Sequence, residues 1–158
     1  MDPTTIVPTF NALPRNKLSP SGSVPNHWHI SLRTVPLQPP GELLFIISPP
    51  SRYIHVEGPL PPSFATSSPE MRSSMIGILL LQAFNGGLGA GHEGGGVGRP
   101  WSWVCQDAEM AGGVGETLRL MGVTEPGDMG IAESEENEIA DESWGSFMDK
   151  LRGQVGEG

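Results

Sequence analysis

Four side chains on two short segments offer the most specific chemistry in this sequence. His27 and His29 lie two residues apart, as do His55 and Glu57. On a β-strand, side chains two residues apart point to the same face of the sheet. If these two strands pair in register, three imidazoles and one carboxylate come together as ligands for zinc or iron. His27, His29 and His55 are therefore the candidate ligands of a metal-dependent enzyme; the alternative is that they belong to the exposed polar face of a sheet.

Other catalytic and cofactor motifs in the sequence are incomplete. The stretch Gly89–Gly94 matches G-x-G-x-x-G, but that motif holds a dinucleotide only where a strand precedes it and a helix follows, and the reverse order is expected here. His92 and Glu93 lack the second histidine of H-E-x-x-H. Cys105 falls on an alternating strand, where a cysteine is more often a small buried apolar residue than a nucleophile. We therefore predict no catalytic residue and no bound cofactor.

The length and charge of the chain limit the classes of function. The chain has 158 residues, which suits one domain, and a net charge of −9. From Ser73 onward it contains fourteen acidic residues and four basic ones. Since such a surface repels phosphate groups, nucleic acids and anionic membranes are not expected as partners. The most apolar stretch, Met75–Phe84, is too short to span a bilayer.

The single cysteine and the first ten residues indicate the cellular compartment to expect. Cys105 has no second cysteine to pair with, so neither an internal disulfide nor a multi-cysteine zinc site is possible. Met1–Phe10 lacks the basic and apolar regions of a secretory signal. We expect an intracellular protein, in the cytoplasm or the nucleus.

Alternating and continuous apolar patterns predict the strands that would position the histidines. The first three are His27–Thr34, Glu42–Ser48 and Arg52–Glu57, joined by short proline-rich turns typical of an antiparallel meander. A fourth strand is expected over Trp101–Cys105 and a last short one over Met129–Ala132.

Capping residues and apolar spacing predict three helices. The first begins at a capping box of Ser67 and Glu70, and the second begins at Asp107 and ends at Gly122. The third begins at Ser134 and ends at Gly153. The second helix has a single apolar stripe, formed by Ala111, Val114, Leu118 and Met121. It also contains three glycines (Gly112, Gly113 and Gly115), so tertiary packing or the close approach of another backbone has to stabilise it.

Together these elements predict an α+β fold, with a small, mainly antiparallel sheet packed against three helices. We expect a disordered proline-rich tail over residues 1–26, a single domain over residues 27–152, and a frayed tail over residues 153–158. Residues 86–98, in which glycine dominates, are expected to form a flexible loop within the domain.

The order of several short motifs resembles a region of uncharacterised fungal proteins, some of which also carry a MYND-type zinc finger. The motifs are Ser67-x-x-Glu70-Met-Arg, Pro100-Trp-x-Trp103, Asp107-x-Glu109 with Leu118-x-x-Met121-Gly-Val, and Ala140-Asp-Glu-Ser-Trp144-Gly-x-Phe147. The resemblance spans residues 28–151 and implies a compact accessory domain. The zinc binding and protein recognition of the finger do not carry over, because one cysteine cannot supply its two zinc sites.

The sequence therefore favours a non-enzymatic, intracellular protein-interaction or accessory domain with an unknown protein partner. A groove between the helices or the glycine-rich loop would form the contact surface. The alternatives are a metal-dependent enzyme that uses the histidines on the sheet and a diverged paralogue without activity.

Overall fold

A computed structural model describes residues 3–14, 26–35, 41–49, 52–86, 99–124 and 129–156. The elements, in chain order, are α1 (Pro3–Ala12), β1 (His27–Val35), β2 (Gly41–Ser48), β3 (Tyr53–Glu57), the 3-10 helix η1 (Pro62–Thr66), α2 (Pro69–Asn85), β4 (Ser102–Cys105), α3 (Ala108–Met121), β5 (Gly130–Ile131) and α4 (Ser134–Gly156). The five predicted strands and three predicted helices are all present, with boundaries that differ by a few residues. The predicted glycine-rich loop lies outside the described residues except for Gly86.

The five strands form one mixed sheet in the order β3-β2-β1-β4-β5. The predicted meander is confirmed, because β1 pairs with β2 and β2 with β3 in antiparallel fashion. However, β4 pairs in parallel with both β1 and β5. The prediction of a mainly antiparallel sheet is therefore wrong. The physical reason is that α2 precedes β4 and α3 precedes β5, and a helix that crosses over a sheet returns the chain in the same direction.

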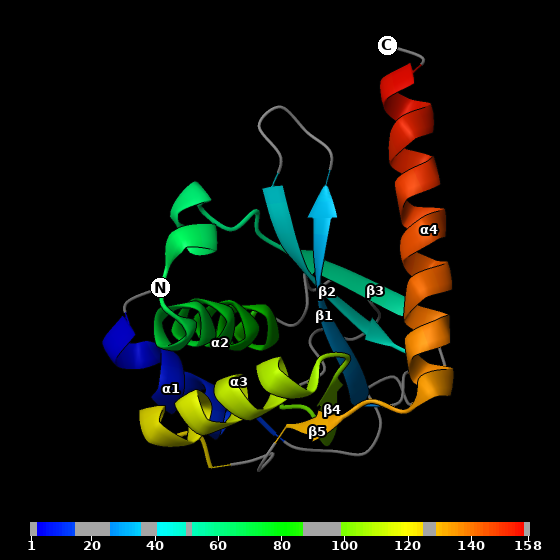
Figure 1. The fold of residues 1–158 in the computed structure, drawn as a ribbon. Helices are drawn as coiled ribbons and strands as arrows, with labels where there is room; N and C mark the ends of the chain where they lie inside the picture. Colours follow the sequence, from blue (N-terminus) through cyan, green and yellow to red (C-terminus); the bar gives the residue numbers. More distant parts are fainter. Residues whose placement is uncertain are drawn as a thin grey trace.

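Helices cover both faces of the sheet (Figure 1). On one face, α1, α2 and α3 form the main core with Trp28, Ile46 and Trp103 of the sheet. On the other face, α4 packs over a smaller core that contains Phe45 and Ile47. The register explains this division, since neighbouring residues of a strand point to opposite faces.

Helix α1 corrects the count of three helices and, for residues 3–12, the prediction of a disordered tail; residues 15–25 of that tail lie outside the described residues. Residues 3–12 are helical, and Ile6 and Phe10 are fully buried in the main core. Phe10 stacks on Trp103 and meets Phe84 edge-on. Proline inside a helix costs about 3 kcal/mol, but burying two large apolar side chains contributes about 3–6 kcal/mol. The burial of Ile6 and Phe10, which lie one helical turn apart, therefore outweighs the free-energy cost of Pro8.

The ends of the helices largely follow the predicted caps. Asp107 Oδ1 accepts a hydrogen bond from Glu109 N at 2.9 Å, and Gly122 ends α3 in the left-handed conformation. Helix α2 is capped by Ser68 rather than Ser67. Helix α4 continues to Gly156, so the helix end predicted at Gly153 is wrong, whereas the frayed tail over residues 153–158 stays a prediction. A glycine costs a helix about 1 kcal/mol and does not by itself end it.

No helix among the described residues is long and apolar enough to cross a membrane.

Candidate functional site: a groove between α2 and α3

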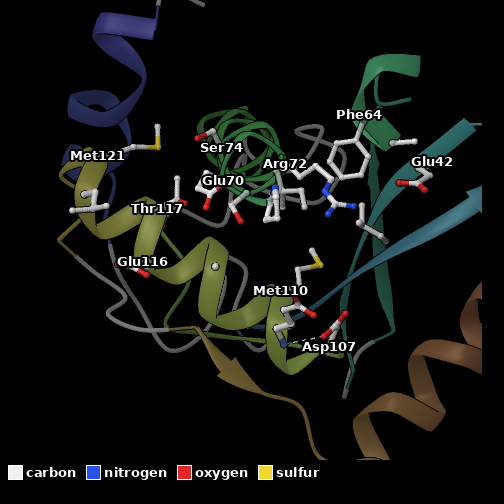
Figure 2. A pocket seen from close by; sticks show the side chains of 18 residues that line it. Glu42, Phe64, Glu70, Arg72, Ser74, Asp107, Met110, Glu116, Thr117 and Met121 are labelled. Atoms are coloured by element: carbon white, nitrogen blue, oxygen red, sulfur yellow. Dashed lines mark hydrogen bonds between the residues drawn. The ribbon is translucent and has the colours of Figure 1, made fainter. Parts of the chain in front are cut away.

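Small residues bring α2 and α3 close together at the floor of a groove. A Cβ atom added to Gly113 would lie 2.7 Å from Ser73 Oγ, and one added to Gly77 would lie 3.2 Å from Leu118 Cδ2. Figure 2 shows α2 nearly end-on while α3 runs across the view, so the two helices cross where these contacts lie. Close packing therefore explains the glycines of α3, as the sequence suggested. Gly112 is the exception, because a Cβ atom added there would meet nothing within 4 Å.

The groove has a volume of about 990 Å³. Its apolar lining comes from β1, η1, α2 and α3, and the largest of these side chains are Leu32, Phe64, Ile76, Met110, Leu120 and Met121. Figure 2 shows Met110 and Thr117 on the side of α3 that faces α2, and Arg72 of α2 extending towards Phe64. The lining therefore combines large apolar side chains with an equal share of polar and charged ones.

The charged residues around the groove are almost all acidic. Among the described residues, five carboxylates and one cation, Arg72, line it. The acidic residues are Glu42, Glu70, Asp107, Glu109 and Glu116. Within the described part of the chain, the ion pairs join other residues: His27 with Glu136, Arg33 with Asp141, Arg52 with Glu142, and His55 with Glu57. The negative charge of the groove is therefore not neutralised by neighbouring side chains.

The structure separates the three histidines that the sequence offered as metal ligands. His29 pairs with Ile47, whose side chain belongs to the core under α4, whereas His55 pairs with Ile46, which belongs to the main core. β2 also lies between the two strands. His27 and His29 consequently share one face of the sheet and His55 lies on the other. The candidate metal site of His27, His29 and His55 is not formed, and the described residues contain no group of three metal-ligating side chains.

His27 and His29 instead connect the sheet to α4. The ring of His27 is hydrogen-bonded to Ser102 Oγ at 2.6 Å through Nδ1 and to Glu136 through Nε2. His29 Nε2 lies 2.8 Å from Asn137 Oδ1. The alternative interpretation placed this face in solvent, but α4 covers it, and the side chain of His29 is fully buried.

Arg33 continues this line of contacts. Its guanidinium donates to Asp141 at 2.9 Å and to Gln106 at 3.0 Å, and it lies over the rings of Phe45 and Trp144. The polar residues of β1 follow in the order His27, His29 and Arg33. Their partners follow in the same order along α4: Glu136, Asn137 and Asp141. The sequence contains two signals of this contact: polar residues alternate along β1, and polar residues form a stripe along α4. Sequence reasoning missed the pairing because the partners are more than a hundred residues apart.

Burial controls the protonation of these groups. Burial lowers the pKa of His29 below its usual 6.5, and the hydrogen bond to Asn137 only partly opposes this effect. Burial by itself raises the pKa of Glu136, but the hydrogen bond from Glu133 N and the neighbouring His27 outweigh it, so the pKa is lowered. Both groups therefore favour the deprotonated form in the folded protein.

The connected Ser102, His27 and Glu136 have the order of a nucleophile, a base and an orienting carboxylate. Ser102 lies within a central strand, however, and faces the helix that supplies Glu136. This arrangement positions α4 on the sheet, and the groove lies on the opposite side of the sheet.

Cys105 is fully buried, as expected. Burial raises the pKa of its thiol to about 11. The thiolate needed for nucleophilic attack is therefore scarce at neutral pH.

Comparison of the chain with protein-family models, with curated proteins and with solved structures finds no match. The resemblance to a region of fungal proteins therefore stays a prediction, and the function has to be argued from the geometry.

Proposed function

We propose that this chain is a non-enzymatic, intracellular protein-interaction domain that binds a segment of a partner protein in the groove between α2 and α3. The observation that carries the proposal is a concave surface in which large apolar side chains lie together and one of them, Leu120, is strongly exposed. Leu120 is 78% exposed although it lines the groove. Exposed apolar side chains that gather in a concave surface mark interaction sites more often than scattered ones do.

The composition of the groove favours a peptide segment. Met110 and Met121 have flexible, polarisable side chains that adapt to different apolar partners. The lining follows α3 from Glu109 to Met121, about 18 Å. A depression of this length suits a helix with apolar residues at i, i+3, i+4 and i+7. The volume is also near the upper end of the range for small-molecule sites.

The proposal is tested with a display library of random peptides about 16 residues long, or some four helical turns. We expect the full chain to enrich a family of peptides with a shared apolar spacing. Thr117→Trp fills the groove and should weaken binding of these peptides at least about tenfold, or about 1.4 kcal/mol. Fluorescence anisotropy with labelled peptides measures the change.

Ser146→Trp is the matched control, because Ser146 is an exposed small polar residue on α4, away from the groove. The Ser146→Trp variant should bind the enriched peptides with the same affinity as the wild type. If no peptide is enriched, or if Thr117→Trp binds the enriched peptides as well as Ser146→Trp does, the groove is not a peptide-binding site and the reading as a diverged paralogue without activity gains support.

A further inference from the structure

We infer that the occupant of the α2–α3 groove is a cationic amphipathic helix, that is, a segment that carries lysine or arginine beside large apolar residues. This inference rests on the proposed function and goes beyond it, because it specifies the chemistry of the partner. Its basis is charge complementarity: five carboxylates and one guanidinium give the lining a net charge of −4.

The acidic residues are spread along the groove. Asp107 caps α3 and Glu109 lies in its first turn. Glu116 follows about two helical turns later on the same helix. Glu70 contributes a further carboxylate from the first turn of α2, which crosses α3 (Figure 2).

Large apolar side chains lie beside these carboxylates at the end of α3. Leu120 and Met121 belong to its last turn, eleven and twelve residues beyond Glu109. At 1.5 Å per residue, this separation is about 16–18 Å along the helix. The occupant should therefore carry cationic residues along about three helical turns, beside an apolar face.

Binding itself would strengthen the effect of these charges. Exposed ion pairs contribute little because water screens them, but a bound helix would displace water from the lining. The acidic side chains also have no cationic neighbours in the described part of the chain apart from Arg72 of the lining itself. A cationic partner would thus find several unpaired carboxylates, whereas an acidic partner would be repelled.

The test uses three synthetic amphipathic helices with the same leucine face, whose polar face contains lysine, glutamine or glutamate. Binding to the full chain is measured by fluorescence anisotropy at low and high salt. We expect the lysine peptide to bind at least about tenfold more tightly than the glutamine peptide at low salt. High salt should reduce this preference, and the glutamate peptide should bind most weakly.

A double neutralisation identifies the carboxylates responsible. Glu70→Gln with Glu109→Gln should bring the lysine and glutamine peptides to within about threefold of each other. The matched control, Glu135→Gln with Glu138→Gln, removes two exposed carboxylates from the start of α4 and should leave the preference unchanged. Circular dichroism of both double variants verifies that each one is folded.

The outcomes distinguish failure of the cationic-partner inference from failure of the groove as a binding site. If the glutamine or glutamate peptide binds as tightly as the lysine peptide, and Thr117→Trp abolishes that binding, the cationic partner is ruled out while the proposed function stands. If the lysine peptide binds Thr117→Trp and the wild type equally, the groove is not the site and both proposals fail. Loss of the lysine preference in the control variant would also overturn the inference, and so would failure of all three peptides to bind.

Discussion

His29 shows how the surroundings of a side chain decide its chemistry. Its imidazole is fully buried between β1 and α4, and Nδ1 has no hydrogen-bond partner among the described residues. A buried neutral ring with one accepted or donated hydrogen bond is tolerable, but a buried imidazolium would lack a partner for one of its two N–H groups. His29 is therefore a neutral structural contact to Asn137.

The folded protein should become less stable as the pH falls below the usual histidine pKa of 6.5. The pKa of His29 is lower in the folded state, so the unfolded chain binds a proton first and the free energy of unfolding decreases with falling pH. The lowered pKa of Glu136 acts in the same direction below about pH 4.5. Urea unfolding at about pH 7.5 and about pH 5.5 measures the effect.

His29→Gln should reduce this pH dependence, because the variant keeps a polar side chain but has no group that titrates there. Thr34→Ala, at an exposed position of the same strand, serves as the control and should retain the wild-type dependence. An undiminished loss of stability in His29→Gln would assign the dependence to other groups.

The residue patterns of β1 predicted part of this arrangement. The alternation of Trp28 and Ile30 with His29 correctly assigned these side chains to opposite faces of the sheet. It gave no information on whether the polar face would meet water or a helix. That depends on α4, which begins more than a hundred residues later, and periodicity within one strand contains no signal for such a pairing.

At the scale of the element, α3 combines strong end signals with a glycine-rich interior. Its cap at Asp107 and its end at Gly122 were predictable because each depends on local hydrogen bonds. The function of each interior glycine was not predictable, because it depends on what the neighbouring elements place opposite. Gly112 meets open space, whereas Gly115 lies against the backbone of Met129.

Alanine substitutions at these two glycines should have opposite effects on stability. Gly112→Ala should increase the free energy of unfolding by about 0.5–1 kcal/mol, through helix propensity alone. Gly115→Ala should decrease it by about 1–2 kcal/mol, since the new Cβ would lie 3.3 Å from Met129 N, a backbone atom. Urea denaturation followed by tryptophan fluorescence measures both. Equal effects would mean that Met129 does not pack against α3.

At the scale of the whole molecule, the sheet has helices on both faces and α1 completes the main core. The sequence predicted the strands and three helices, but not α1, because Pro8 and the surrounding prolines masked the spacing of Ile6 and Phe10. The mixed pairing was also missed. It depends on where β4 enters the sheet, beside β1, and strand patterns by themselves do not specify neighbours.

Phe10→Ala tests whether α1 is an integral part of the fold. Removing a fully buried aromatic ring that stacks on Trp103 should lower the free energy of unfolding by about 3–5 kcal/mol. The control Thr9→Ala, at an exposed position of the same helix, should change it by less than about 0.5 kcal/mol. Chemical denaturation measures both variants, and a loss below about 1 kcal/mol for Phe10→Ala would show that α1 is not packed in the core.

The contacts of Asn11 have a consequence for synthesis on the ribosome. Its side chain donates to Gly122 O and accepts from Thr124 N, so the residues joined are 111 and 113 positions apart. α1 is translated before α2 and α3, so its contacts with Phe84 of α2 and with the end of α3 form only after those helices have been made. Until then Ile6 and Phe10 remain open to chaperones and to other nascent chains, and closing so long a loop makes this docking a late step in folding.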